Sequence, residues 1–130
     1  ADSMDSVARS LPGLWRAEKL QNKAASAGFE WPDVQGALDK LEEEVGELRR
    51  AVEEGGDVPE ELGDVLFSLV NVARRMGVSS ENALRASCRK FRTRWSAMER
   101  SAFEQDVRLE DMTCEEQNRL WEQAKADLRK

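Results

Sequence analysis

The sequence predicts an all-α protein, an antiparallel helical bundle with a four-helix core and a further C-terminal helix. Apolar residues recur at helical spacing along most of the 130 residues. The connections between these periodic segments are short, which is typical of antiparallel neighbouring helices. A content of 40% hydrophobic and 35% charged residues, with only 8 Gly and 3 Pro, argues against both wholesale disorder and a β-sandwich. We expect one domain over residues 1–130, with residues 1–5 as a disordered or expression-derived remnant.

The first two helices are indicated by their end signals. One is expected from about Ser6 to Ala27, because Gly28 is a favourable residue just after a helix. Pro32 suits the first turn of the second helix, which should run to about Glu53.

The remaining three helices have similar signals. A Gly-Gly-Asp break at 55–57 precedes Pro59, which opens a third helix reaching Met76. A serine at 79 or 80 can cap a fourth helix that continues to about Phe103. After a polar stretch, Thr113 and Glu116 have the spacing of a capping box, so a last helix should run to the C-terminus.

Charge and composition exclude several classes of function. Acidic residues outnumber basic ones by 26 to 20, a net charge of −6, which argues against a nucleic-acid-coating surface. The chain has no histidine, so histidine acid–base chemistry and most zinc and di-iron sites are excluded. Cys88 and Cys114 do not have the spacing of metal ligands, so we expect two ordinary reduced thiols. No apolar run approaches the roughly 18 residues of a membrane span, and no signal peptide opens the chain. We therefore expect a cytoplasmic protein.

Carboxylates gather on one part of the second helix. At 100° per residue, Leu41 and Val45 lie on an apolar side that continues towards residue 52. Glu43, Glu44 and Glu47 form a patch of their own, one turn of helix long. Such a patch by itself is typical of a solvated helix face.

The third helix changes this interpretation. It is apolar around most of its circumference and should therefore be buried. A polar strip about 80° wide nevertheless follows one side of it, formed by Glu61, Asp64, Ser68 and Asn71. Buried carboxylates are costly unless a cation pairs with them, and the neighbouring patch is acidic as well. Oxygen ligands without histidine or thiolate favour Mg²⁺, or Mn²⁺ in its stead.

A basic pair lies on the fourth helix. Lys90 and Arg94 are one turn apart, beside Phe91 and Trp95. They are either partners in surface salt bridges or a clamp for phosphate oxygens. An acidic metal site together with a basic pair suits a polyphosphate ester. Any one of the four tryptophans could serve as a platform for base stacking, and spacing does not select it.

Two segments carry a resemblance to a known family. Residues 39–47 (DKLEEEVGE) and 60–67 (EELGDVLF) resemble the E-E-x-x-E … E-x-x-D signature of the MazG nucleoside triphosphate pyrophosphohydrolases. Flanking matches extend the resemblance over residues 11–125, at Arg16–Gln21, Gly28–Trp31, Asn71–Arg74, Lys90–Arg94 and Trp121. The catalytic, C-terminal half of the longer members is the part that the chain resembles. Two departures stand out: the loop before Glu60 lacks a basic residue, and Thr93 replaces a second arginine.

The resemblance implies an all-α, Mg²⁺-dependent enzyme that converts NTPs or dNTPs to nucleoside monophosphate and pyrophosphate. It implies the metal ligands Glu44, Glu47, Glu61 and Asp64. Lys40, Lys90 and Arg94 would contact the triphosphate, with Glu43 and Asp64 close to it, and Trp121 would lie against the nucleotide. Glu43, Glu44 and Glu47 are the candidate catalytic carboxylates: Glu44 or Glu47 would take the proton of a metal-activated water that attacks the α-phosphorus.

Three questions stay open at the level of sequence. The chain could be a base-selective relative similar to the all-α dUTPases and dCTPases, or a non-catalytic helical interaction module. It is expected to be a homodimer or a dimer of dimers, because a helix that is apolar all round needs more cover than one short bundle provides. The physiological role expected from the resemblance is clearing the nucleotide pool.

Overall fold

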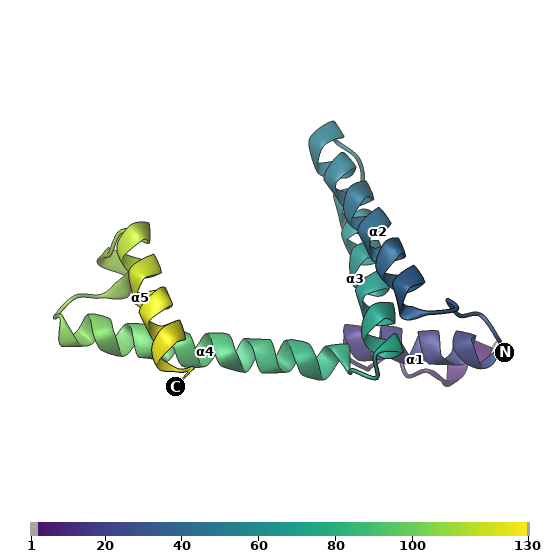
Figure 1. Cartoon of the computed structure of the whole chain (residues 1–130), viewed down its shortest axis with the longest axis horizontal. Helices are drawn as coiled ribbons and strands as arrows, with labels where there is room; N and C mark the ends of the chain where they lie inside the picture. Colours follow the sequence, from purple (N-terminus) through teal and green to yellow (C-terminus); the bar gives the residue numbers. More distant parts are fainter. Residues whose placement is uncertain (1–2, 130) are drawn as a thin grey trace. The chain divides into compact units, whose positions relative to one another are not determined.

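The computed structural model describes residues 3–129, and every regular element in that range is helical. In order, these are η1 (Ser3–Ser6), α1 (Gly13–Ser26), α2 (Val34–Glu54), α3 (Val58–Arg75), α4 (Ser80–Glu104), η2 (Leu109–Asp111) and α5 (Cys114–Asp127) (Figure 1). The all-α prediction is confirmed. Of the expected N-terminal remnant, residues 1 and 2 lie outside the described residues, and η1 begins at Ser3. None of the helices within 3–129 combines the length and apolar character needed to cross a bilayer.

Most helix ends lie within a residue or two of their expected positions, but α1 begins seven residues later than predicted. Pro12 disfavours a helical conformation at the residue before it, so a helix cannot run unbroken from Ser6, and Pro12 is the N-cap residue of a helix that begins at Gly13. At α2 the cap is Asp33, whose carboxylate accepts a hydrogen bond from the Gly36 amide at 2.8 Å. The capping box of Thr113 and Glu116 is present at α5, as predicted.

The first compact unit extends to Ala83 and is built around a helical hairpin. Helices α2 and α3 run side by side, and α1 packs against α3 (Figure 1). Gly55 closes α2 with a φ of 79°, a left-handed conformation that favours glycine, and the chain turns back into α3. This hairpin brings the carboxylates of the second and third helices to a common place.

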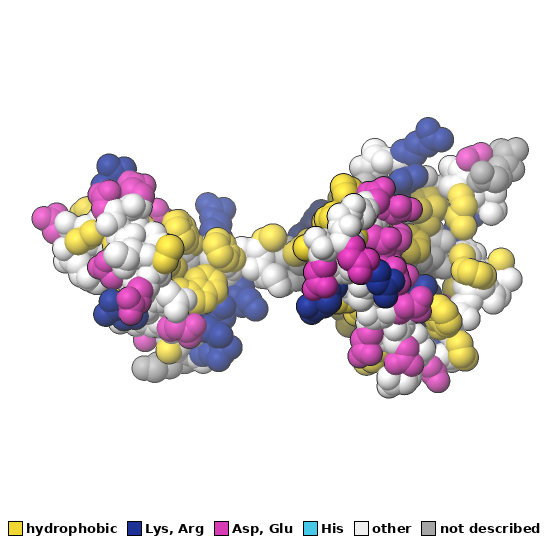
Figure 2. Space-filling view, turned by 90° about the horizontal axis from the view of Figure 1, so that it is seen from above, with side chains coloured by type: hydrophobic (Ala, Val, Ile, Leu, Met, Phe, Trp, Pro, Cys, Tyr) yellow, Lys and Arg dark blue, Asp and Glu magenta, His cyan; other side chains and the backbone are white. Residues whose placement is uncertain are grey.

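The buried part of this unit is small. Val70 and Ala37 are each 1% exposed, whereas Leu62, Leu66 and Leu69 on α3 are 44–46% exposed. Hydrophobic side chains are accordingly visible on its surface beside the acidic ones (Figure 2). The expectation that the third helix is buried all round is therefore wrong for the single chain, because neither α1 nor α2 covers this leucine stripe.

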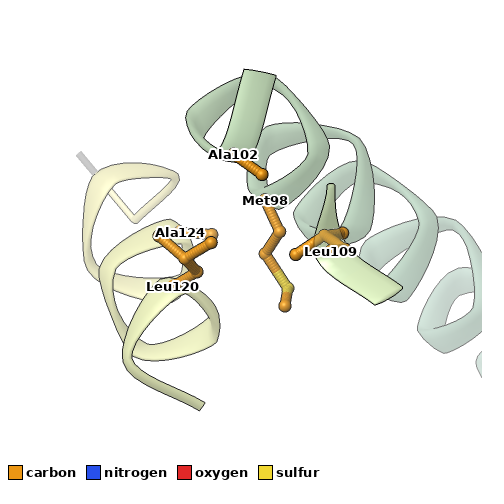
Figure 3. Packing of buried hydrophobic residues seen from close by; sticks show 5 residues of the cluster. All are labelled: Met98, Ala102, Leu109, Leu120 and Ala124. Carbon is orange, nitrogen blue, oxygen red and sulfur yellow. The ribbon is translucent and has the colours of Figure 1, made fainter. Parts of the chain in front are cut away.

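The second compact unit, from Leu84 onward, has a core of its own. Met98 and Ala102 of α4 pack with Leu109, Leu120 and Ala124, which η2 and α5 supply (Figure 3). The Gln117 side chain donates a hydrogen bond to the Leu109 carbonyl at 2.8 Å, which ties η2 to α5. These contacts hold α5 against the C-terminal part of α4.

Candidate active site

The second helix presents its polar site residues along one side. Lys40 Nζ lies 2.9 Å from Glu44 Oε1 and 3.4 Å from Glu43 Oε1, because residues three and four apart are neighbours on a helix. The side chain of Glu44 is 12% exposed, whereas that of Glu43 is 63% exposed. The hydrogen bond to Glu44 raises the pKa of Lys40, so the lysine is firmly protonated. Glu44 is thus the covered member of the patch, and Glu43 lies at its edge.

The third helix contributes its carboxylates from its first two turns. Asp57 caps this helix by accepting a hydrogen bond from the Glu60 amide at 3.1 Å, and Pro59 lies in the first turn. Glu61 and Asp64 follow at a spacing of three residues, which puts them on one face. Glu61 lies in the first turn, where the helix dipole favours negative charge, and Asp64 lies one turn further along.

The hairpin brings three of the four predicted metal ligands together. Carboxylate oxygens of Glu44, Glu61 and Asp64 all lie within 4.8 Å of one another, and we call this trio the carboxylate cluster. The all-oxygen donor set therefore fits a hard divalent cation.

The electrostatics of the cluster also favour a cation. Loss of hydration raises the pKa of Glu61, and the neighbouring negative charges, led by those of Asp64 and Glu47, raise it further. The influence of Glu47 indicates that this fourth predicted ligand lies near the cluster. Its side chain is 41% exposed and accepts a hydrogen bond from Arg50 at 3.0 Å. A proton or a metal ion would relieve this repulsion.

The predicted phosphate and nucleotide contacts of α4 and α5 belong to the second unit. The guanidinium of Arg94 lies over the ring of Trp121, with 5.2 Å between its central carbon and the ring centroid. Phe91 contacts the same ring, with a centroid distance of 5.5 Å. Lys90 is exposed on α4. Arg94 and Trp121 therefore form a cation–π pair, while the Arg94 side chain remains partly exposed.

A cavity of about 630 Å³ lies in the first unit, between α1, α2, α3 and the connection from α1 to α2. Its apolar wall includes Leu20, Phe29, Trp31 and Phe67, and its polar groups include Asn71 and Arg74. Lys40 lines the cavity and its ammonium also contacts Glu44, so this side chain links the lining of the cavity to the carboxylate cluster.

Sequence reasoning did not identify this cavity or its polar network. Arg74 Nη2 lies 2.6 Å from the Glu30 carboxylate and 2.8 Å from Asn71 Oδ1. Buried Gln21 donates a hydrogen bond to the Phe67 carbonyl at 2.9 Å. All of these residues except Phe67 fall within the flanking segments of the family resemblance, but nothing in those segments indicated which of them pair.

A family model and several known proteins are similar to this chain in sequence. Residues 33–98 match the family described as the MazG nucleotide pyrophosphohydrolase domain. The chain is 35% identical over 127 residues to the nucleoside triphosphate pyrophosphohydrolase of Escherichia coli, an alignment covering 95% of this chain and 48% of that protein. It is 39% identical over 115 residues to the nucleoside triphosphate pyrophosphohydrolase/pyrophosphatase MazG of Thermotoga maritima, covering 88% and 45%. Identity to the uncharacterized protein YabN of Bacillus subtilis is 43% over 130 residues, covering 98% and 27%.

The chain spans about half the length of the first two relatives. The family match covers half of this chain and includes α2 and α3 with all three residues of the carboxylate cluster. On this evidence, the chain belongs to the MazG nucleotide pyrophosphohydrolase domain family.

Proposed function

We propose that this chain is a Mg²⁺-dependent hydrolase that converts nucleoside triphosphates, NTPs or dNTPs, to nucleoside monophosphate and pyrophosphate. The carboxylate cluster of Glu44, Glu61 and Asp64 is the observation that carries this proposal, because it assembles the ligands of a hard cation from two separate helices. Family membership and the names of the two relatives from E. coli and T. maritima support the same reaction.

In this proposal Glu44, Glu61 and Asp64 hold Mg²⁺, with Mn²⁺ as a substitute, and Glu47 completes the ligand set from one turn further along α2. The bound ion would supply positive charge for the phosphate oxygens and acidify a water molecule. Lys40 lies beside Glu44, so its ammonium group is placed to neutralise negative charge on a triphosphate bound at the cluster. The resemblance adds Lys90 and Arg94 as further triphosphate contacts and Trp121 as a contact of the nucleotide.

The candidate general bases are Glu44 and Glu47. We favour Glu47, because it is accessible and pairs with the surface residue Arg50: one of its carboxylate oxygens could bind the ion while the other takes the proton. Taking a proton from the attacking water, it would direct the water oxygen to the α-phosphorus. The bond between that phosphorus and the bridging oxygen would break, and pyrophosphate would leave. Glu43 lies at the edge of the site, paired with Lys40, where it can position the substrate.

A homodimer, or a dimer of dimers, is part of the same proposal. The stripe of Leu62, Leu66 and Leu69 on α3 is nearly half exposed, and Val45 and Val52 on α2 are exposed at a spacing of seven residues. Exposed apolar stripes at helical spacing are typical of surfaces that pack against a partner helix. A second copy of this chain would cover both stripes at once.

Removal of unwanted nucleotides from the pool is the physiological role that we propose. Because nucleoside triphosphates are abundant in the cytoplasm, the proposal places the chain there. We also propose that residues 1–130 form one domain.

The product of the reaction provides the test. Incubation with a panel of NTPs and dNTPs and Mg²⁺ should release pyrophosphate, with no orthophosphate as the first product. Asp64→Asn and Glu47→Gln should lower kcat by about a hundredfold or more, the usual cost of losing a group that stabilises charge at the reacting centre. Glu42→Gln is the matched control, because it removes a carboxylate from the exposed side of α2 outside the site.

Other results would favour the alternative functions. A preference of about a hundredfold for one base in kcat/KM would indicate a base-selective relative of the dUTPase and dCTPase kind. Absence of hydrolysis with every nucleotide, in a protein that remains folded, would indicate a helical interaction module. Orthophosphate as the first product would contradict attack at the α-phosphorus.

A further inference from the structure

We propose that Lys40 competes with the divalent cation for Glu44, so that this lysine limits the affinity of the carboxylate cluster for metal. The inference rests on the proposed function, because it takes the carboxylate cluster as the metal site. It differs from the triphosphate contact that the resemblance gives to Lys40, because it assigns the lysine an effect on metal binding before any nucleotide arrives.

The proposed ligands of α2 are each paired with a cation of their own helix. Lys40 Nζ lies 2.9 Å from Glu44 Oε1, four residues away. Arg50 Nη1 donates a hydrogen bond to Glu47 Oε1 at 3.0 Å, three residues away. An ammonium and a divalent cation on one carboxylate repel each other. Metal binding at Glu44 or Glu47 therefore weakens a contact that the helix already makes.

The proposed ligands of α3 have no such partner. Within residues 3–129, neither Glu61 nor Asp64 forms an ion pair. Their carboxylate oxygens nevertheless lie within 4.8 Å of an oxygen of Glu44. Among the described cations, Lys40 is thus the one that forms an ion pair with a member of the carboxylate cluster.

Burial makes Lys40 a stronger competitor than Arg50. The side chain of Glu44 is 12% exposed, whereas that of Glu47 is 41% exposed. Water and salt screen a covered ion pair less than an exposed one, so the covered pair is the harder one to break.

Glu43 gives the displaced lysine a second acceptor. Its Oε1 lies 3.4 Å from Lys40 Nζ, and its side chain is largely exposed. The ammonium can therefore leave Glu44 without leaving α2. Once the metal ion has taken Glu44, the lysine keeps its positive charge beside the site.

Three variants with the same loss of charge test the competition. Lys40→Met keeps the length of the side chain and should lower the Kd for Mg²⁺ about three- to tenfold. Arg50→Met should lower it about twofold, because its ion pair is more exposed. Arg49→Met is the matched control on α2 and should leave the Kd unchanged, because Arg49 pairs with Glu53 at 3.8 Å outside the cluster. Isothermal titration calorimetry measures all four proteins.

Thermal unfolding separates competition from a purely structural role. In EDTA, Lys40→Met should have a lower Tm than the wild type, because the cluster has lost its counter-ion. With saturating Mg²⁺ the two Tm values should converge, since the ion binds the native variant more tightly. A lysine that only stabilises the helix would lower the Tm equally in both conditions, and this result would overturn the inference.

The outcomes distinguish the inference from the proposed function. An unchanged or raised Kd in Lys40→Met, or an equal decrease in Arg49→Met, would overturn the competition while pyrophosphate release by the wild type still supports the proposed reaction. Tighter Mg²⁺ binding by Lys40→Met alone, in a chain that releases no pyrophosphate, would support the competition although the reaction fails. A wild type that binds neither Mg²⁺ nor Mn²⁺ would overturn the competition as well.

Discussion

Neighbouring charges give two glutamates of the first unit opposite properties. At Glu30, partial burial acts to raise the pKa, but the hydrogen bond and positive charge of Arg74 outweigh it, and the pKa is lowered. At Glu61, loss of hydration and the charges of other carboxylates act in the same direction, and the pKa is raised. The negative charge of Glu30 is therefore compensated by its ion pair with Arg74. Glu61 has a charge that only a proton or a cation can offset.

The first prediction at this scale concerns metal binding. Mg²⁺ at a hundred times its dissociation constant should stabilise the native chain by about 2.7 kcal/mol, which corresponds to a Tm increase of about 10 °C. Glu61→Gln should abolish this increase and raise the Tm of the metal-free protein, because it removes a repelling charge. Glu42→Gln should retain the full increase. Scanning calorimetry with Mg²⁺ and with EDTA measures both effects, and a wild type insensitive to Mg²⁺ and Mn²⁺ would contradict the metal site.

The second prediction concerns pH. Because the pKa of Glu30 is lower in the folded than in the unfolded chain, its ion pair stabilises the fold above the ordinary value of 4.5. This contribution is lost as the pH falls below 4.5 through the folded pKa. Glu30→Gln should therefore be less stable than the wild type at pH 7, and the difference should fade towards pH 3. Urea unfolding in EDTA across this range measures it, and a difference that is constant with pH would refute the assignment.

Single residues of the carboxylate cluster could be predicted from the sequence, whereas the polar network of the cavity could not. Glu61 and Asp64 stand out because they interrupt a largely apolar helix. Glu30 and Arg74 lie on different segments, and each taken alone is an ordinary surface charge. Their pairing depends on the packing of α1 against α3, which no local pattern encodes.

At the scale of the elements, caps decide where the site begins. Asp57 closes the short connection from α2 and starts α3, so that Glu61 and Asp64 fall in the first two turns. The connection holds its shape partly through Gly55, whose positive φ other residues adopt only with strain. The caps of α2 and α5 follow the same chemistry, with side-chain oxygens accepting from backbone amides.

A substitution at Asp57 tests how much this cap contributes to stability. Asp57→Ala removes the acceptor for the Glu60 amide and should cost about 1 kcal/mol of unfolding free energy. Asp57→Ser offers a hydroxyl in the same position and should recover most of the loss. Urea denaturation of the three proteins measures the difference. Equal stability of the alanine and serine variants would show that the cap contributes nothing.

Helix existence and type followed from periodicity, and helix ends followed from caps and prolines. The late start of α1 was the main difference, and Pro12 accounts for it because it restricts the residue before it. Helical periodicity also predicted an apolar stripe on α3. Periodicity does not indicate whether another helix of the same chain packs over this stripe.

For the whole molecule, the exposed stripes of α2 and α3 lead to a prediction about assembly. Sedimentation should find two or four copies of the wild-type chain. Leu66→Glu puts a charge on the leucine stripe and should shift the equilibrium to monomer, while helicity measured by circular dichroism is retained because the residue is already 44% exposed. Gln35→Glu adds the same charge at an exposed position of α2 and is the control. A wild type that is monomeric at all concentrations would contradict the dimer.

The sequence alone determined the helical class and most of the helix ends, which caps and prolines set, and it singled out the carboxylates of the proposed metal site. These features depend on neighbours within about four residues along the chain, where spacing and side-chain chemistry are sufficient. Only the tertiary structure decided that Glu44 meets Glu61 and Asp64, that a cavity forms between α1, α2 and α3, and that a leucine stripe is left uncovered. Each of these depends on how one helix packs against another, and many apolar faces of similar composition could pack in many ways.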